Sequence, residues 1–562
     1  MMPSSDEAAP VPEEQVKVYT IHVSSRYLDL TRQKLELVRL PHDAPHAHDD
    51  EWWEPKSTVD PLVDYCLSSD EADHRGSRLE ENSWRQREAE FNASIPQFRT
   101  TIRTSSPDSP VRLHFIHSRS AHANAVPLLL IPPFPFTNLS LKHAINAFTT
   151  VNDPAKDIPF HLVIPSLPGL GFSDPITSNK RMISLIAEML DTLMRRIGYI
   201  HYLATNAAPS PNSVSDIDWR VVNHVATSYP DSCLGAHFVS PVFKQPTLQN
   251  APLEWIKWKA VMMLSKPVLG YSQDDITAFR HQDKLNRGPV DNPGLRVNKV
   301  FEPNTLSYAL CDSPTGLLLF ILMVLRMLGP KHQLSKREII EIAELTWLPG
   351  PEGTIRLLAH SVTAPDDLKM GPKKPTVGIT VFEDNRNQMD DQESGAVFPV
   401  PSPYVHTCRG WGRSSYNIVS WQRVPGSPGL LIWERPEVIA AGVRRLAEAI
   451  VAKDNRLQKS TDPRAALPEQ IAVGGDDATP GEISGTPFQT QDMSHFGVAA
   501  EKGPLAEQGH FGQDIKARRR PHTPMFPLMV EPSQDADPDI GEFSPSSSAG
   551  SPDTIKPVMR IA

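Results

Sequence analysis

The residues that could carry chemistry in this chain lie between a strand-like segment and a helix-like one. Residues 201–219 read HYLATNAAPSPNSVSDIDW: a short apolar start, a Pro/Ser/Asn-rich loop and the first turn of a helical run. A turn between a strand and a helix is where many hydrolases carry their nucleophile, so the question is whether this segment holds one. Asp216 stands at the start of the helical run, and because Asp is a common helix N-cap, SDID before an apolar helical run favours capping over catalysis.

Other catalytic signatures are missing from the sequence. It contains no Gly-x-Ser-x-Gly elbow, no Walker-type phosphate loop and no dinucleotide-binding fingerprint. One cluster has metal-ligating residue types, but adjacent positions in a Pro-rich loop define no ligand geometry: His42, His46, His48, Asp49 and Asp50. We expect a solvated loop there, and neither a metal nor a cofactor.

The elements that must position Asp216 follow a strand, loop, helix rhythm from about residue 111. Strands are predicted at VRLHFIH, PLLLIP, FHLVIPS, YIHYLA, TVGITVF and NIVSWQRV, and helices at MISLIAEMLDTLMRRIG, DWRVVNHVATSYP and PEVIAAGVRRLAEAIVAK. Unbroken apolar strands alternating with amphipathic helices indicate a mostly parallel sheet covered on both faces. The fold class is therefore α/β.

Three helix-like segments interrupt this rhythm between about 245 and 350: LEWIKWKAVMML, TGLLLFILMVLRML and KREIIEIAELTWL. They predict a helical cap inserted over the sheet. The run GLLLFILMVL at 316–325 is too short to span a bilayer, so it predicts a buried core helix.

The two ends of the chain differ from its centre. Residues 14–110 hold few long periodic segments, and their aromatic residues predict an arm anchored on the main domain: Trp52, Trp53, Trp84, Phe91 and Phe98. Residues 1–13 and 453–562 are polar and rich in Pro, Gly and Ser, which predicts disorder. The basic stretch KARRRP at 516–521 is interpreted as a solvated charge run.

Charge and cysteine usage restrict the functional class. A formal net charge of −10 argues against a general nucleic-acid or anionic-membrane binder, because either partner would be repelled over most of the surface. The four scattered cysteines form no disulfide or zinc pattern. The acidic first residues lack the pattern of a signal peptide. These features predict a soluble, cytoplasmic protein with small-molecule or protein partners.

Several segments, in this order, resemble the microsomal-type epoxide hydrolase family over roughly residues 14–451: YLDLTRQKLELVRLP, WRQREAEFNASIPQF, LHFIHSRS, PSLPGLGFSD, YPDSCLGAHFVSP, EPNTLSYALCDSPTGLL and WERPE. The resemblance implies an α/β-hydrolase fold with a helical cap and an N-terminal wrapping domain. It also implies hydrolysis of an epoxide to a vicinal diol, with a small apolar substrate in the cap pocket. In this family an Asp attacks the epoxide, a His–acid pair activates water, cap tyrosines bind the epoxide oxygen, and backbone N–H groups bind the oxyanion.

The elbow and the oxyanion turn of the family can be sought residue by residue. The family has Gly-Gly-Asp-Trp-Gly after the strand; counting forward from the strand places the Asp on Ala208, and counting back from YP at 229–230 places it on Asp216. The family's His-Gly-aromatic-Pro-Gly turn reads PPFPF at 132–136. Because proline has no N–H, Phe134 remains the candidate oxyanion-hole donor.

The remaining catalytic positions are substituted. The His position falls on Gly429; no His occurs between Cys408 and Glu437, and His406 is the nearest alternative. The acid falls near Asn385, directly after Glu383 and Asp384. The cap tyrosine positions read Gly294-Leu295 and Arg356-Leu357-Leu358, and Tyr308 is interpreted as a packing residue.

Two hypotheses follow from these substitutions. The first is an epoxide hydrolase with Asp216 as its nucleophile. The second is a non-catalytic α/β-hydrolase-fold protein that binds a small apolar ligand or a protein partner. The members of a catalytic set act as a unit, so the joint loss of base and tyrosines favours the second.

Overall fold

The apolar segments of the chain assemble into one mixed sheet. Among the described residues the sheet has nine strands in the order β1-β2-β3-β5-β4-β6-β7-β8-β9. Their bounds are β1 Lys17–Val18, β2 Gln97–Ile102, β3 Val111–Ser118, β4 Val126–Ile131, β5 Phe160–Pro165, β6 Tyr202–Asn206, β7 Cys233–Val239, β8 Thr376–Glu383 and β9 Asn417–Pro425. Strands β4 to β9 pair in parallel, and β1, β2 and β3 extend the sheet in antiparallel pairs. The predicted α/β class, with a mostly parallel sheet, is confirmed.

The computed structural model describes residues 14–43, 54–74, 83–105, 110–151, 153, 156–177, 181–208, 215–241, 243, 245–273, 275–277, 279, 303–363, 368, 371, 373–383 and 407–459. All of them belong to one unit of the chain, within Met1–Met493. The predictions for residues 1–13, the basic stretch at 516–521 and most of the His/Asp cluster at 42–50 therefore lie outside the described residues.

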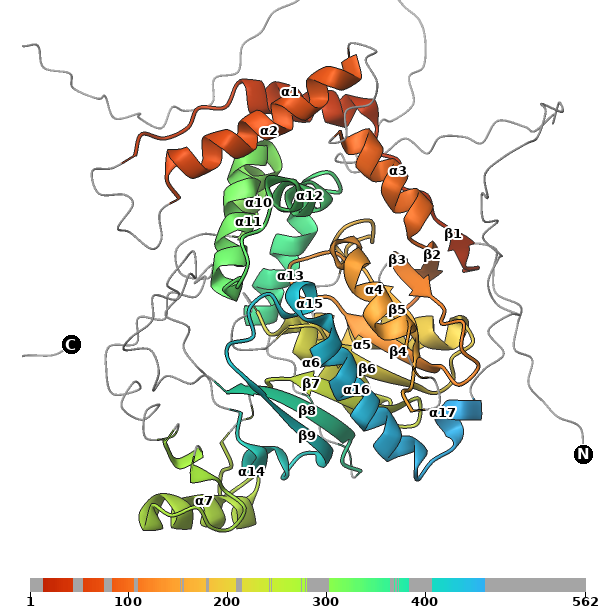
Figure 1. Ribbon diagram of the computed structural model, residues 1–562, viewed down its shortest axis with the longest axis vertical. Helices are drawn as coiled ribbons and strands as arrows, with labels where there is room; N and C mark the ends of the chain where they lie inside the picture. Colours follow the sequence, from red (N-terminus) through yellow and green to blue (C-terminus); the bar gives the residue numbers. More distant parts are fainter. Residues whose placement is uncertain are drawn as a thin grey trace, which may run out of the picture. The chain divides into compact units, whose positions relative to one another are not determined.

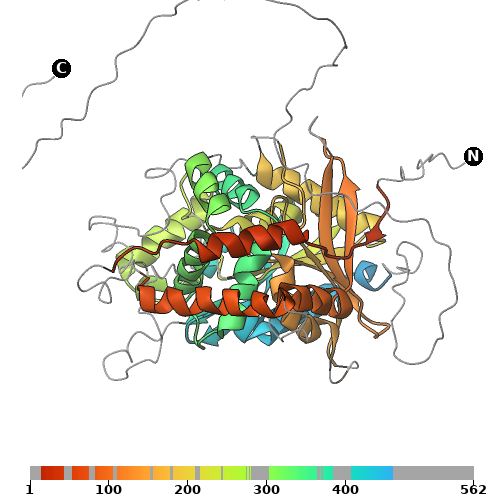
Figure 2. The same ribbon diagram turned by 90° about the horizontal axis from the view of Figure 1, so that it is seen from above.

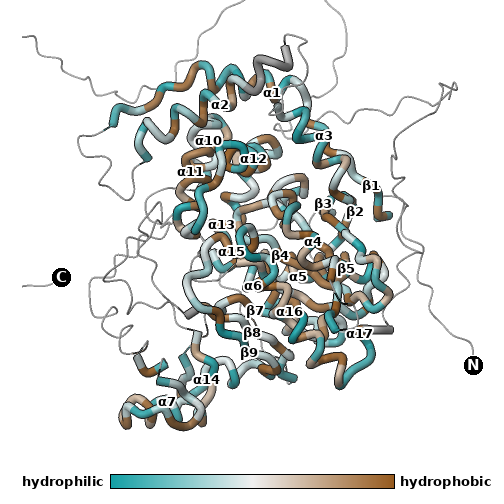
Figure 3. Tube along the Cα trace, viewed as in Figure 1, coloured by the Kyte–Doolittle hydropathy of each residue, from teal (hydrophilic) through white to brown (hydrophobic). Residues whose placement is uncertain are grey.

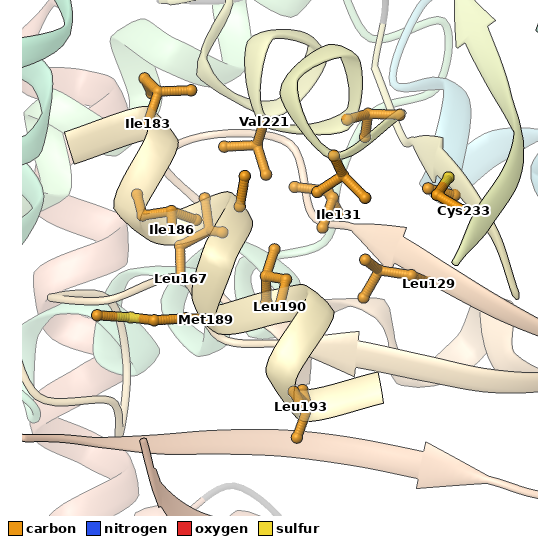
Figure 4. Close-up of a cluster of buried hydrophobic side chains, with 14 of the residues drawn as sticks. Leu129, Ile131, Leu167, Ile183, Ile186, Met189, Leu190, Leu193, Val221 and Cys233 are labelled. Carbon is orange, nitrogen blue, oxygen red and sulfur yellow. The ribbon is translucent and has the colours of Figure 1, made fainter. Parts of the chain in front are cut away.

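Helices cover both faces of the sheet (Figure 1). On one face lie α5 (Met182–Arg196) and α6 (Ile217–Ser228), and on the other α4 (Ile145–Thr149), which follows the short 3-10 helix η2 (Asn138–Ala144), and α16 (Pro436–Val451). A hydrophobic core lies on each face of the sheet: the first core is formed with α5 and α6, and the second core with α4 and α16. Strand β4 contributes to both, because Leu129 and Ile131 face the first core and Leu128 and Leu130 face the second. Figure 4 shows the first core, with Leu129 and Ile131 beside Ile186, Leu190 and Val221.

The N-terminal segment wraps onto this domain with three helices, α1 (Ser25–Glu36), α2 (Lys56–His74) and α3 (Trp84–Ser94), before β2 joins the sheet. Figure 2 shows α1 and α2 side by side. The predicted anchors Trp84, Phe91 and Phe98 are buried. Trp52 and Trp53 lie outside the described residues.

The helices of the predicted cap form two separate groups. Helices α10 (Pro303–Asp312), α11 (Pro314–Leu328) and α12 (Lys336–Trp347) pack together, and α13 (Glu352–Thr363) continues the group past residue 350. Helix α7 (Pro252–Leu264) instead packs beside the short α14 (Arg409–Gly412), at a distance from the others (Figure 1). As predicted, α11 is a buried core helix, with Leu317, Ile321 and Val324 enclosed.

No described helix is by itself long and apolar enough to cross a bilayer. Helices α10 and α11 together reach that length, but they are bent by 116° to each other.

The C-terminal end of the described chain differs from its prediction in one detail. After α15 (Leu431–Glu434) and α16, a short helix α17 (Arg456–Lys459) buries Leu457 against the second core. The packed domain therefore extends to Lys459, several residues beyond the predicted boundary at 453. The rest of the predicted tail, 460–562, lies outside the described residues.

Candidate active site

The candidate site is the edge of the sheet where the parallel strands end. Strand β4 pairs with β5 on one side and with β6 on the other, so the chain runs from β4 to β5 in one direction and then from β5 back past β4 to β6. Ligands of open α/β sheets bind outside the carboxyl ends of the strands at such a point. The segments that meet this edge follow Ile131, Asn206, Val239 and Pro425.

The turn after β6 is held by a buried amide. The Asn206 side chain donates from Nδ2 to the Ala208 carbonyl (2.6 Å), and its Oδ1 accepts from the Val239 backbone N–H (3.0 Å). Ala208 is buried directly after the strand, where the forward count places the nucleophile. A methyl group at this position offers no nucleophilic atom.

Asp216 occupies the N-cap position of α6, as the helix-start interpretation predicts. Its side chain, however, makes no capping hydrogen bond, which corrects that interpretation. The carboxylate is half exposed and lies 3.8 Å from Arg220 Nη1, one helical turn further along. Asp216 therefore behaves as a surface group in this structure.

Asp218, at the second position of α6, is the carboxylate that the sequence reasoning overlooked. It is fully buried, and among the described residues neither carboxylate oxygen has a hydrogen bond of normal geometry. Burial, together with the nearby Asp216 charge, raises the pKa of Asp218 to about 7, and weak hydrogen bonds from the Trp219 and Ala208 backbone and the Asn206 amide offset this only in part. The start of α6 thus brings Asp218 back to the end of β6. The signal that could have found it is the pair Asp218-Trp219, which repeats the Asp-Trp of the family's elbow motif.

The predicted oxyanion turn follows β4 and is closely packed. Phe134 is fully buried in the first core and precedes a cis peptide bond to Pro135. Phe136 packs edge-on against Trp433 (5.0 Å between ring centroids), and its N–H donates to the Pro133 carbonyl (2.8 Å). Helix α6 contacts β4, so this turn and Asp218 belong to the same region.

The loop after β9, where the family places its general base, has no room for one. Gly429 has φ +62°, and a Cβ built there would lie 2.4 Å from Glu434 Oε2. Glu434 is fixed, because its Oε1 accepts the backbone N–H groups of Lys331 (2.6 Å) and His332 (3.0 Å). Glu434 therefore ties the segment after α11 to this loop, directly beside Gly429.

The family's cap tyrosine positions that the structure describes hold no tyrosine. Leu357 and Leu358, at the family's tyrosine positions, are buried in the first core. Tyr308 on α10 is 74% exposed, so its interpretation as a packing residue is wrong. Gly294 and Leu295 lie outside the described residues, as do Asp384, Asn385 and His406; Glu383 is the last residue of β8.

Of the buried histidines in the sheet, His237 is the one on β7, next to β6, and it faces away from α6. His237 on β7 has Nδ1 2.9 Å from Thr205 Oγ1 and Nε2 2.9 Å from Thr380 Oγ1. A Cβ on Gly442 of α16 would lie 2.3 Å from its Nε2, so the ring faces α16 and not α6. Burial lowers the pKa of His237 to about 3. His237 is therefore a neutral link between strands.

Metal chemistry finds no support in the described residues. Within those ranges no group of three or more His, Cys, Asp or Glu side chains could hold a metal ion.

Comparison with known proteins gives the same family at the level of sequence and fold. The family profile described as "Epoxide hydrolase N terminus" matches residues 16–141. A protein of Stigmatella aurantiaca named "Putative epoxide hydrolase" is 24% identical over 66% of this chain and 73% of its own length. Juvenile hormone epoxide hydrolase 2 of Ctenocephalides felis is 25% identical over 43% of this chain, and the match spans about half, 47%, of that relative.

Solved structures share the fold. The juvenile hormone epoxide hydrolase of the silkworm Bombyx mori aligns with a TM-score of 0.60 at 18% identity, over 78% of this chain and 96% of that one. The Aspergillus niger epoxide hydrolase aligns with a TM-score of 0.54 at 19% identity, over 78% and 97%. The N-terminal profile and the sequence relatives therefore support the epoxide hydrolase family to which the sequence points, and the solved structures share its α/β-hydrolase fold.

Proposed function

We propose that this epoxide hydrolase-like protein does not release diols, and that it uses its fold to bind a small apolar molecule. The observation that carries the proposal is Gly429, at the position of the general base. Its left-handed backbone and the carboxylate of Glu434 leave no space for an imidazole. Without a base, water attacks the alkyl ester of an epoxide hydrolase slowly, because the members of a catalytic set act together.

A second candidate function is favoured by Asp218. A carboxylate at the carboxyl end of β6 can attack an epoxide carbon, breaking the C–O bond of the ring and forming an alkyl ester. The alkoxide takes up a proton, and the Phe134 N–H is our proposed oxyanion donor. With a pKa of about 7, Asp218 is partly ionised at neutral pH. Because Asp218 is fully covered in this structure, the binding proposal ranks above this one.

The ligand class rests on the relatives. Two of them are named for the epoxide of juvenile hormone, and all those compared are named for epoxides. We therefore propose an epoxide-containing or similar apolar small molecule as the ligand, with a protein partner as the alternative. We also propose a cytoplasmic location, which is supported by four cysteines of the described residues that form no disulfide: Cys66, Cys233, Cys311 and Cys408.

Diol formation from a panel of aryl and alkyl epoxides tests the proposal directly. The purified full chain is compared with Asp218→Asn and Asp216→Ala, with circular dichroism as the check on folding. A folded chain that forms no diol supports the proposal. Diol formation abolished by either substitution would overturn it and identify the nucleophile.

Intact-protein mass spectrometry after incubation with the same epoxides distinguishes the second candidate function, ester formation at Asp218, from simple binding. A stable adduct with the mass of one epoxide, lost in Asp218→Asn and kept in Asp216→Ala, would establish ester formation without hydrolysis. An adduct lost only in Asp216→Ala would assign the nucleophile to Asp216.

A further inference from the structure

Helix α7 turns an apolar stripe away from the molecule. Four large apolar side chains on it are strongly exposed: Leu253 (73%), Ile256 (54%), Met263 (90%) and Leu264 (58%). Their spacing of three, seven and one residues places them on one side of an α-helix. We call these four residues the outer stripe of α7. Leu248 before the helix and Leu269 after it are also exposed, by 59% and 54%.

The opposite side of α7 is apolar as well, and it accounts for the attachment of the helix. Val261 is fully buried in a small cluster with Tyr271, Phe279 and Cys408. Trp258 packs edge-on against Trp411 beside α14 (6.5 Å between ring centroids). The helix is therefore apolar on two sides, and only one of them is covered. Figure 3 colours parts of α7 as hydrophobic. An exposed apolar stripe of this size typically marks an interaction site.

Lysines border the outer stripe on both sides. Lys257 and Lys259 follow Ile256 by one and three positions, which places one on either flank of the stripe. Lys259 Nζ lies 4.5 Å from the ring centroid of Trp258 and 5.9 Å from that of Trp255. Long cationic side chains beside tryptophans and exposed Leu, Ile and Met are the features of helices that lie in a membrane interface.

Helix α7 itself carries more cations than anions, although the whole chain is acidic. Residues 248–271 contain Lys257, Lys259 and Lys266 beside one acid, Glu254, which pairs with Lys257 (2.7 Å). Two aspartates follow at 274 and 275, and Asp275 accepts from the N–H and hydroxyl of Ser272.

Further cations adjoin the helix from α14 and the neighbouring strand. Arg413 Nη1 lies 3.0 Å from the position of a Cβ on Gly270, and the Lys374 ammonium donates to the Arg413 carbonyl (2.8 Å). Burial lowers the pKa of Arg409, and the charges of the nearby Arg413 and Arg423 lower it further. A net charge of −10 is thus compatible with a local positive field at this end of the domain.

We propose that α7 docks the protein on an anionic lipid surface, with the outer stripe inserted between the head groups and the lysines and arginines on the lipid phosphates. The chemistry favours lipid over a protein groove, because cations flank both sides of an apolar stripe that stands clear of the rest of the domain. The proposal does not depend on hydrolytic activity. The net charge of −10 argues against general binding to anionic membranes, but it does not exclude binding through one cationic site. Salt screens the repulsion between the lipid and the other, acidic parts of the surface beyond about 10 Å at 0.1 M.

Vesicle co-sedimentation of the full chain tests the proposal. Vesicles of phosphatidylcholine alone are compared with vesicles containing 30% phosphatidylserine, on the order of an anionic leaflet, at low and at physiological salt. We expect binding to the anionic vesicles, weakened by salt, with a blue shift of tryptophan emission. Ile256→Glu combined with Met263→Glu is expected to lower binding at least about tenfold. Lys257→Glu combined with Lys259→Glu is expected to act in the same direction.

The matched control replaces two exposed apolar residues elsewhere, Leu37→Glu with Ile200→Glu, which are 83% and 63% exposed. It is expected to bind as the unmodified chain does. Failure of the unmodified chain to bind anionic vesicles, or equal losses in the control and in the α7 variant, would overturn the proposal. So would a dimer in light scattering that the α7 variant converts to monomer without any change in lipid binding.

Discussion

Two fully buried charged residues, Arg87 on α3 and Asp218 on α6, have opposite surroundings. Arg87 Nη2 lies 2.5 Å from Glu344 Oε2 on α12, and this pair joins the N-terminal helices to the cap. Burial by itself lowers the pKa of Arg87, but attraction and hydrogen bonding to Glu344 outweigh it and raise the pKa. Asp218 has no such partner among the described residues, and burial moves its pKa toward neutrality. A buried charge with a partner stays ionised, and one without a partner drifts to its neutral form.

The difference separates a structural role from a candidate functional one. The Arg87–Glu344 pair is accompanied by other links between the same helices, such as Trp347 Nε1 to Thr31 Oγ1 (2.8 Å) and Arg337 to Glu90 (2.8 Å). Packing between the wrapping arm and the cap explains all of them. The polar neighbours of Asp218 are the Trp219 and Ala208 backbone and the Asn206 amide, and a buried carboxylate without a cationic partner costs stability.

Arg87→Ala should give the largest effect, because it leaves Glu344 without its buried partner. The expected loss is about 3–5 kcal/mol in the free energy of unfolding, measured by chemical denaturation. Replacing both residues, as Arg87→Met with Glu344→Met, should recover much of the loss. A loss below about 1 kcal/mol for Arg87→Ala would mean that the pair contributes as little as a surface ion pair.

Asp218→Asn should act in the opposite direction and depend on pH. The pKa of Asp218 is raised from 3.8 to about 7 on folding, so the folded state binds more protons than the unfolded state between these values. Stability contributed by this group is therefore fully present below about pH 4 and is lost as the pH rises to about 7. The shift corresponds to at most about 4 kcal/mol. Denaturation of both proteins between pH 4 and 8 should show the variant gaining relative stability over this window; a constant difference would contradict the raised pKa.

Gly429→Ala tests whether the loop after β9 could hold a side chain at the position of the family's general base. The substitution places a Cβ at φ +62° and 2.4 Å from Glu434 Oε2. The expected loss is about 1–3 kcal/mol, the cost of strained backbone. Gly426→Ala, with φ +81° and its nearest neighbour, Lys331 Nζ, at 3.7 Å, is the matched control for backbone strain alone. An equal loss in both variants would remove Glu434 as the steric obstacle.

The sheet was predictable from sequence, whereas the arrangement of its carboxyl edge was not. Segments such as PLLLIP and TVGITVF are apolar on both faces, and only a covered parallel strand satisfies that pattern. The sequence analysis missed Asp218 as a candidate nucleophile because the loop before it has a different length from the family's. Counting residues forward through this loop gives Ala208, and counting backward gives Asp216. Helix α7 was also predicted only in part. Its apolar composition predicts burial, but composition alone does not tell which sides of the helix a neighbouring element covers.

Asp216→Ala should have the smallest effect and sharpens the contrast between the two aspartates of α6. Asp216 is half exposed, and its 3.8 Å contact with Arg220 is a solvent-screened pair within one helix, so we expect a change below about 1 kcal/mol in the free energy of unfolding, measured by chemical denaturation. Arg220 keeps its hydrogen bond to the Ser361 carbonyl (2.6 Å), so α6 stays attached to α13 in the variant. A loss above about 2 kcal/mol would contradict a surface role for Asp216, because an exposed ion pair within one helix contributes less than that.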